Sequence, residues 1–345
     1  MALGLRGSKG VAAAPYTAGP YTWDQFVTFS GGAAFAASKG GIQFVDGTSG
    51  SDGNTGTSWG EAKATIQAAV TTAGAYGTVF VLPKAQAAGV TDPGSYAENI
   101  IIPATNESVS IIGVGNRTQS GLPQLKVGTT TTSPILTIRS CGCRILGLGV
   151  NGAGATGGGI LLDDDSSTKS SYGTEIANCH FKNCKGSTAT NAATGGAINW
   201  SATGNAWQVW IHDNKFYKNV GDVVLLGTTT SVPQDVTIES NIFSGPAASV
   251  DCNLYLAGGS GMNGLIVRDN VFPAIPAVGA GTNAKFMNLT GCVGIMSGNM
   301  FAAAQTRTFG AAGDELVPTT MFMAGNWAEI AIGDDNYQGK TVGRT

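Results

Sequence analysis

Charge is scarce in this chain of 345 residues. Only 12% of the residues are charged, with 19 Lys and Arg against 22 Asp and Glu, and histidine occurs twice, as His180 and His212. A nucleic-acid-binding surface needs a clear excess of basic residues, so we expect no nucleic-acid partner. Any mechanism that uses histidine has to use one of these two residues.

Long apolar runs are missing as well. No stretch approaches the roughly 18 apolar residues of a bilayer-spanning helix, which predicts that the chain has no membrane partner. The N-terminus carries Arg6 and Lys9, and Gly, Ser and Pro interrupt it before a signal-peptide core can form. We therefore expect the chain to be made in a cytoplasm.

Cysteine is present, but without the spacing of a zinc site or of a redox C-x-x-C motif. The six residues are Cys141, Cys143, Cys179, Cys184, Cys252 and Cys292. We expect small buried thiols, with a disulfide or a metal site as the alternative, and we expect neither a metal nor a cofactor.

Glycine is abundant, with 52 residues, about twice its average usage. Together with the low charge, this composition argues against a helical protein. Hydrophobic residues make up 42% of the chain, which is enough to bury a core and argues against disorder.

Residues 1–41 form a Gly/Ala/Ser-rich segment that cannot build a fold by itself. We expect an extended arm that docks on a partner through aromatic residues. The predicted docking residues are Tyr16, Tyr21, Trp23, Phe26 and Phe29.

Residues 42–108 are expected to form the first part of the fold, with one short helix. The segments IQFV, TVFVLP and NIIIP are predicted strands. Ser58 and Glu61 form a capping-box pattern ahead of an Ala-rich segment. Ile66, Ala69 and Val70 follow at helical spacing, which predicts an amphipathic helix.

From residue 109 to 345 the chain consists of short apolar strands divided by Gly, Asn, Asp and Ser. A six-residue pattern recurs there: an aliphatic residue, two variable residues, Asn, one variable residue and an aromatic. The copies are IHDNKF (211–216), IESNIF (238–243), VRDNVF (267–272) and MSGNMF (296–301), with imperfect copies IANCHF (176–181) and IGDDNY (332–337). The last residues of these copies lie 27 to 36 residues apart. A helix-free repeat of this length predicts a solenoid of parallel strands with about eight turns, ~4.8 Å apart.

Equivalent residues of successive turns lie above one another in such a coil. The first and last residues of the pattern then face inward, and the aromatics form one buried stack. We expect the Asn at a bend, with left-handed backbone and an amide bonded to the Asn residues above and below. The predicted structural ladder consists of Asn214, Asn241, Asn270 and Asn299 with Phe181, Phe216, Phe243, Phe272, Phe301 and Tyr337.

The block FVDGTSGSDGNTGTSWGEAKATIQAAV is followed by TVFVLP, YAENIIIP and SVSIIGVG. Over about residues 42 to 115, this series resembles the start of the right-handed parallel β-helix proteins of the pectin-lyase-like superfamily. The repeat pattern extends the resemblance over residues 116 to 337. It implies an all-β, right-handed parallel β-helix whose N-terminal end is closed by a short helix. Because the fold carries lyases, hydrolases, viral tailspikes and passive virion proteins, the resemblance implies no single activity.

Enzymes of that fold act on polysaccharides, and hydrolysis would need paired carboxylates on neighbouring turns. The outward position after the first aliphatic residue reads Ala177, His212, Glu239, Arg268, Ser297 and Gly333. The next position reads Asn178, Asp213, Ser240, Asp269, Gly298 and Asp334. Acids do not follow acids in either column, and Glu239 between His212 and Arg268 predicts a surface ion-pair ladder.

No catalytic residue is therefore predicted with the preferred function. The alternative catalytic or cation-binding candidates are the run Asp163, Asp164 and Asp165, for which a solvated loop is the simpler interpretation. Trp200, Trp207 and Trp210 are the alternative sugar-binding platforms, although Trp200 is equally compatible with the core.

The preferred hypothesis is a non-enzymatic structural protein of a tailed-bacteriophage virion. The chain would be a homotrimeric capsid decoration (cement) protein, made in the host cytoplasm, whose N-terminal arm docks on the major capsid protein or another virion subunit. The alternative is a tailspike- or fibre-type protein that binds polysaccharide or degrades it as a lyase or hydrolase. A bacterial surface adhesin is a third alternative, which the missing secretion signal opposes.

Overall fold

A computed structural model describes residues 40–86, 94–115, 121–166, 169–188, 191–201, 206–228, 231–244, 252–256, 262–272, 285–304, 317–330 and 340–342. Two groups of residues from the sequence predictions lie outside these ranges. They are the docking residues Tyr16, Tyr21, Trp23, Phe26 and Phe29, and the aromatic Tyr337.

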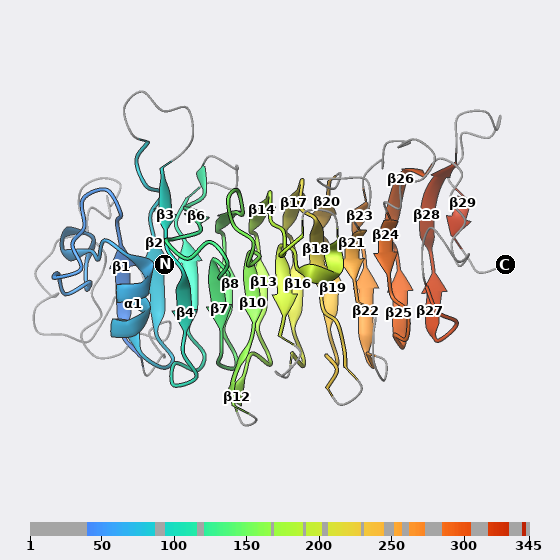
Figure 1. The fold of residues 1–345 in the computed structure, drawn as a ribbon, viewed down its shortest axis with the longest axis horizontal. Coiled ribbons are helices and arrows are strands. Elements are labelled where there is room, and N and C mark those ends of the chain that lie inside the picture. The colour runs from blue at the N-terminus through green and yellow to red at the C-terminus, as the bar shows by residue number, and fades with distance from the viewer. Residues whose placement is uncertain are drawn as a thin grey trace, which may run out of the picture. The chain divides into compact units, whose positions relative to one another are not determined.

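Three sheets build a coil (Figure 1). Sheet A contains β1 (Ile42–Val45), β2 (Thr78–Val81), β5 (Ser110–Gly113), β8 (Arg144–Leu146), β13 (Glu175–Ala177), β16 (Trp210–His212), β19 (Thr237–Glu239), β22 (Leu265–Arg268), β25 (Gly294–Ser297) and β27 (Met321–Ala324). Sheet B contains β3 (Ser95–Ala97), β6 (Gln124–Lys126), β9 (Gly149–Asn151), β14 (His180–Lys182), β17 (Lys215–Tyr217), β20 (Ile242–Phe243), β23 (Val271–Phe272), β26 (Met300–Ala304), β28 (Asn326–Ile330) and β29 (Lys340–Val342). Sheet C contains β4 (Ile100–Ile102), β7 (Leu136–Ile138), β10 (Ile160–Leu162), β15 (Ile198–Trp200), β18 (Gly221–Val224), β21 (Cys252–Tyr255) and β24 (Lys285–Asn288).

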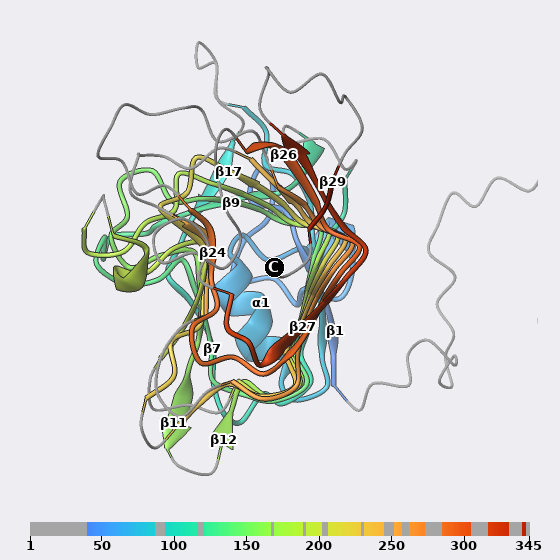
Figure 2. The same cartoon turned by 90° about the vertical axis from the view of Figure 1, so that its right-hand side faces the viewer.

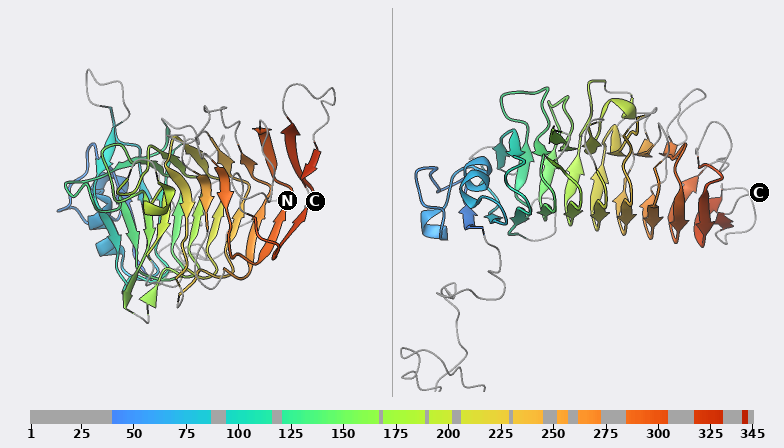
Figure 3. Two further views of the ribbon diagram at one scale, coloured as in Figure 1. Left: turned by 45° about the vertical axis from the view of Figure 1, so that its right-hand side comes forward. Right: turned by 90° about the horizontal axis from the view of Figure 1, so that it is seen from below.

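The strands of each sheet lie side by side along the coil (Figure 3). The chain passes through sheets A, B and C in turn, and the pairs are parallel except that β29 runs antiparallel to β28. The all-β parallel β-helix predicted from the repeat is therefore confirmed. Within the described residues, seven turns carry a strand in all three sheets, slightly fewer than the eight expected. No helix in the described part of the chain is long and apolar enough to cross a membrane.

Helix α1 (Ile66–Ala73) packs on the first turns of the coil. Viewed along the coil, it falls within the outline of the strands (Figure 2). Ile66, Ala69 and Val70 are buried against strands of sheets A and C, as the helical spacing predicts. Two short 3-10 helices, η2 (Trp59–Glu61) and η4 (Ala192–Thr194), are the other described helices.

The predicted capping box is wrong. Ser58 precedes η2 and makes no side-chain cap hydrogen bond. Helix α1 begins later, where the Thr65 hydroxyl accepts a hydrogen bond from the Ala68 N–H at 3.2 Å. Glu98, which follows β3, accepts the N–H groups of Ile66 and Gln67 at 3.0 and 2.9 Å. A carboxylate brought by the fold thus satisfies the free N–H groups at the helix start, which a local pattern cannot reveal.

The aromatic stack is confirmed from Phe181 to Phe301. Ring centroids of Phe181, Phe216, Phe243, Phe272 and Phe301 lie 5.0, 5.0, 4.8 and 4.7 Å apart in succession. All five side chains are buried. In the next turn the partner of Phe301 is Ala328, so IGDDNY does not supply the next copy of the repeat.

The asparagine ladder is confirmed and is longer than predicted. The Nδ2 groups of Asn214, Asn241, Asn270 and Asn299 each donate to Oδ1 of the next asparagine, at 3.1, 3.0, 3.0 and 2.8 Å, and the last acceptor is Asn326. The position that we expected Gly333 to fill beside Ser297 is held by Ala324. The sequence MAGNWA at 323–328 is therefore the next turn, hidden because it ends in Ala instead of an aromatic.

The bend lies one residue earlier than expected. The ladder asparagines do not adopt the left-handed conformation; the residue before each one does. In successive turns, positive φ angles of 55°, 54°, 56°, 55°, 65° and 59° occur at Asn178, Asp213, Ser240, Asp269, Gly298 and Gly325. Gly, Asn and Asp tolerate this conformation well, and Ser240 adopts it in one turn. The ladder position that follows holds the residue whose side-chain amide points into the interior.

The expected burial of the cysteines is confirmed for all except Cys141. All six are free; Cys141 is half-buried and the other five are buried. Cys179 occupies the ladder position one turn before Asn214, and its N–H donates to Asn214 Oδ1 at 2.9 Å. Burial raises the pKa of the Cys179 thiol to about 12, which keeps it protonated and unreactive at neutral pH.

Candidate functional site

A group of polar and aromatic side chains lies on the outer surface of sheet A. Side chains of a strand alternate between the two faces of the sheet, so Ile176 and Ile211 point inward while Glu175, Trp210 and His212 point outward. We call this outer region the charged face; it consists of Arg144, Glu175, Trp210, His212, Glu239 and Arg268, with Asp213 at the corner toward sheet B.

A continuous chain of polar contacts crosses the first half of the charged face. Arg144 Nε donates to Glu175 Oε2 at 2.6 Å, and Glu175 Oε1 lies 3.2 Å from His212 Nε2. His212 Nδ1 lies 2.8 Å from Asp213 Oδ2, so a carboxylate stands at each ring nitrogen. Burial opposes the ionisation of Glu175, but the hydrogen bonds and charges of Arg144 and His212 outweigh it and hold the Glu175 pKa below its usual range.

The second half of the charged face is organised by an indole. The Trp210 ring stacks on His212, with centroids 3.9 Å apart and an interplanar angle of 25°. Trp210 Nε1 donates to Glu239 Oε1 at 2.7 Å, and the other Glu239 oxygen accepts from Arg268.

The predicted ladder therefore has the correct register but one wrong contact. Glu239 does lie between His212 and Arg268, and it pairs with Arg268. His212 instead turns toward Glu175, which belongs to the preceding turn. The reason is that Trp210 lies over the imidazole and itself takes one Glu239 oxygen.

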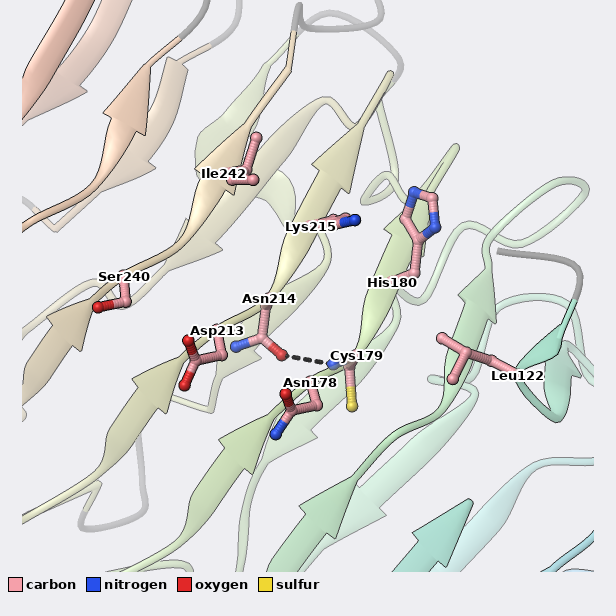
Figure 4. A pocket seen from close by; sticks show the side chains of 9 residues that line it. All are labelled: Leu122, Asn178, Cys179, His180, Asp213, Asn214, Lys215, Ser240 and Ile242. Carbon is pink, nitrogen blue, oxygen red and sulfur yellow. Dashed lines mark hydrogen bonds between the residues drawn. The ribbon is translucent and has the colours of Figure 1, made fainter. Parts of the chain in front are cut away.

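A pocket of about 220 Å³ lies at the corner between sheets A and B, and Asp213 belongs both to it and to the charged face. It is lined by Leu122, Asn178, Cys179, His180, Asp213, Asn214, Lys215, Ser240 and Ile242 (Figure 4). His180 and Lys215 are direct neighbours on β14 and β17. Burial and the like charges of Lys215 and Lys182 lower the pKa of His180 below its ordinary value.

The acidic run lies elsewhere. Asp163 Oδ2 accepts from Arg139 Nε at 2.9 Å. Asp164 lies in β11 (Asp164–Ser166), which pairs antiparallel with β12 (Lys169–Ser170), and Asp165 is exposed. The pair β11 and β12, which follows β10 in the chain, projects from the outline of the coil (Figure 2), away from the charged face.

The tryptophans divide between core and surface. Trp200 is only 8% exposed and belongs to the core, whereas Trp207 and Trp210 are 43% and 42% exposed. Trp207 Nε1 donates to the carbonyl of Val232 at 3.2 Å, which leaves its ring at the surface near the start of β16.

Sequence reasoning missed Glu175 and the role of Arg144. Both lie two residues before the columns that we compared, opposite Trp210 in the register. Extending the comparison of turns by one outward position would have found them, because strand side chains repeat with a period of two. Among the residues that the structure describes, no group of three or more His, Cys, Asp or Glu side chains is placed to hold a metal ion.

No protein-family model matches the chain, and no curated protein matches it. Among solved structures, two with a backbone similar to that of this chain are the following. The GH136 lacto-N-biosidase from Eubacterium ramulus has a TM-score of 0.43 and 10% identity, over 84% of this chain and 68% of its own. The Escherichia coli protein YbhC has a TM-score of 0.46 and 12% identity, over 93% of this chain and 90% of its own. Similarity at this level carries no argument about function.

Proposed function

We propose that the chain is a non-enzymatic structural protein of a tailed-bacteriophage virion. In this proposal it is a β-helix of the pectin-lyase-like superfamily that decorates the capsid surface, with residues 1–41 docked on the major capsid protein. It is made in the host cytoplasm and joins the virion during assembly.

The observation that carries the proposal is the state of the three carboxylates that form ion pairs with arginine on the outside of the coil. Asp163, Glu175 and Glu239 expose only 14%, 19% and 13% of their side chains, and each is bound by an arginine. A general acid for glycoside hydrolysis needs a raised pKa, whereas Arg144 and His212 hold the Glu175 pKa low despite its burial. Ion pairs between turns suit a rigid scaffold better than proton transfer.

The interior supports the same role. The phenylalanine stack links the turns from Phe181 to Phe301, and the asparagine ladder links those from Asn214 to Asn326 with satisfied amide groups. Repeat structures of this kind bind through long, fixed surfaces. A coil with such an interior provides a stiff outer surface that an N-terminal arm can anchor.

A second candidate function is polysaccharide binding, with or without cleavage. The exposed rings of Trp207 and Trp210 favour it, because flat apolar rings beside charged groups can pack against sugars. Asp213 and Glu175 on either side of His212 are the carboxylates that would be available for chemistry there.

Electron microscopy of purified virions tests the preferred function. We expect the protein at threefold or quasi-threefold positions of the capsid. A chain lacking residues 1–41 should fold as a β-helix, by circular dichroism, and should no longer bind capsids. Location at the tail tip alone, or capsid binding that survives the deletion, would contradict the proposal.

A depolymerase assay tests the second candidate. Host capsular or lipopolysaccharide fractions are incubated with the full chain and with the Glu175→Gln and Asp213→Asn variants. We expect no cleavage by any of them. Cleavage by the full chain that both substitutions abolish would establish the enzyme and overturn the non-enzymatic role.

A further inference from the structure

Two columns of exposed apolar side chains run along the last turns of the coil. One is on sheet A, where Ile295 and Phe322 are direct neighbours. The other is on sheet B, where Ile242, Val271, Met300 and Trp327 follow one another in register. We call these six residues the apolar strip; they belong to β20, β23, β25, β26, β27 and β28, which run from yellow to red in Figure 1.

The strip is strongly exposed. Phe322, Met300 and Trp327 expose 67%, 58% and 50% of their surface. Ile295, Ile242 and Val271 follow with 45%, 45% and 39%. Since a whole aromatic side chain presents ~150–250 Å², the two aromatics alone leave roughly 200 Å² of apolar surface in water. Contiguous exposed patches of such residues mark interaction surfaces.

Small uncharged residues join the two columns across the corner. In the last two turns of sheet A, the residues between the columns are Ser297, Gly298, Ala324 and Gly325. In the earlier turns the same places hold His212 with Asp213 and Arg268 with Asp269. In the last two turns, therefore, no charged side chain separates the two apolar columns at the corner.

The charges beside the strip indicate what kind of partner fits it. A lipid surface is usually met by apolar residues bordered by Lys and Arg. Beside the strip lie Lys215, which is the direct neighbour of Ile242, and Glu239, Arg268 and Asp269 in the turns of β19 and β22, so charges of both signs border it. Such a border suits a protein surface with the same mixture.

The geometry favours a second copy of this chain as the partner. Column residues repeat once per turn, ~4.8 Å apart. A parallel copy has the same rise, so its columns can match these turn by turn. A strip with one column on each side of a corner also offers two contact surfaces at an angle. Contacts of that kind form a symmetric ring when the rotation from one copy to the next closes.

We propose that the apolar strip is a self-association surface. In this arrangement the sheet A column of one copy packs against the sheet B column of the next, with the corners directed toward a common axis. The proposal does not rest on a role in a virion, because it depends only on the exposure and the register of the strip residues. It gives the homotrimer expected from the sequence a specific interface.

Sedimentation of the full chain tests the interface. We expect the wild-type chain to sediment as an oligomer and the Ile295→Lys/Phe322→Lys variant to sediment as a monomer. Placing two ammonium groups in an apolar interface should weaken association by roughly 100-fold or more. The matched control is Ile101→Lys, because Ile101 is an exposed strand isoleucine of sheet C at 38% exposure. This control should remain oligomeric.

Cross-linking gives a second measurement that does not disrupt the strip. Ala324→Cys places a thiol at the corner between the columns, and Ala97→Cys places one on an exposed strand residue of β3. A short bismaleimide should link copies through position 324 and not through position 97, relative to the parent chain with its own cysteines. Folding of every variant is checked by circular dichroism.

Three outcomes would overturn the proposal. The wild-type chain could be monomeric at all concentrations, the folded double lysine variant could keep the wild-type oligomer, or Ala97→Cys could cross-link as well as Ala324→Cys. Loss of the oligomer in the double lysine variant with an intact far-ultraviolet spectrum supports it. Because capsids are absent from both measurements, these results stay separate from the test of the decoration role.

Discussion

The middle and last turns of the coil share one inward aromatic column and differ on the outside. The inward aromatic column runs unchanged through Phe216 and Phe301, whereas the outward column beside it changes character. Its earlier members are His180 and Lys215, and its later members are Met300 and Trp327. The fold therefore dictates the inward positions, and the outward positions are free to differ along the coil.

This difference has an energetic basis. An inward side chain must fill space against its copies above and below, and any polar group there must find a partner inside the coil. An outward side chain meets water, so substitutions there rarely change the free energy of unfolding by more than about 0.5 kcal/mol. Function can be placed on the outer surface at little cost, with charge in the earlier turns and apolar surface in the later ones.

The largest effect is expected for an inward aromatic compared with its outward neighbour. Phe216→Ala removes a buried ring that stacks on Phe181 and Phe243, which should lower the free energy of unfolding by about 3–5 kcal/mol. Tyr217→Ala, one residue later and 43% exposed, should cost less than about 1 kcal/mol. Urea denaturation followed by tryptophan fluorescence measures both.

The distinction between interior and exterior would be wrong if Phe216→Ala and Tyr217→Ala lowered the free energy of unfolding by similar amounts. Equal losses would mean that the outward face is packed as tightly as the core in solution. A control with Phe216→Leu, which keeps most of the apolar volume, should recover more than half of the loss.

A smaller difference in the free energy of unfolding is expected between the ladder position of the later turns, which holds Asn270, and that of an earlier turn, which holds Cys179. Asn270 joins three turns: its Nδ2 donates to the Ile238 carbonyl at 2.9 Å and to Asn299 Oδ1, and its Oδ1 accepts two hydrogen bonds from Asn241. Asn270→Ala should cost about 3 kcal/mol, because each buried polar group left without a partner costs about 1–3 kcal/mol. Cys179→Ala, at the same corner in an earlier turn, should cost only about 1 kcal/mol.

Equal costs at these two positions would contradict the view that the later turns depend on the amide ladder. The same urea experiment decides, with far-ultraviolet circular dichroism to show that both variants remain folded at the start. Burial of Cys179 and Asn270 is matched, since neither exposes more than 2% of its surface.

The interior could be predicted from the sequence because the same inward-facing residue types recur in each turn that carries the six-residue pattern. The recurrence of Ile211, Asn214 and Phe216 in later turns was enough to predict which side chains face inward, the stacked rings and the bonded amides. The position of the left-handed residue was wrong by one, because Asn is compatible with both roles and only the backbone of Asp213 and Ser240 distinguishes them. Asn326 was missed because its turn lacks the aromatic.

The outer surface could be predicted only in part, because its contacts depend on side-chain direction across turns. Residue order placed Glu239 beside Arg268 correctly, but it could not show that Trp210 lies over His212 and directs the imidazole toward Glu175. The apolar strip could not be recognised from the sequence either. Exposed hydrophobic residues alternate with buried ones in a strand, and only the measured exposures of Phe322 and Trp327 separate the two.

The smallest expected effect concerns the charged half of the outward column. Burial, Lys215 and Lys182 lower the pKa of His180, and Lys215 is its direct neighbour in the next turn. Lys215→Gln removes one like charge, so the His180 pKa should rise toward its ordinary value. NMR titration of the imidazole protons measures it, and a His212→Gln background leaves a single histidine signal.

Lys126→Gln is the matched control, because Lys126 is an exposed strand lysine that does not contribute to the lowered pKa of His180. An equal rise in both variants would show that net charge, and not the neighbour in the column, sets the titration.

The same group makes stability depend on pH in a defined direction. The folded pKa of His180 is lower than the unfolded value of about 6.5, so the unfolded chain binds more protons between these two values. The contribution of His180 to stability is therefore complete above pH ~6.5 and is lost as the pH falls toward the folded pKa. In His180→Gln this part of the pH dependence should vanish, whereas in Lys215→Gln it should shrink. An unchanged slope of unfolding free energy against pH in both variants would mean that the earlier half of the column, like the later half, carries no charge-dependent energy.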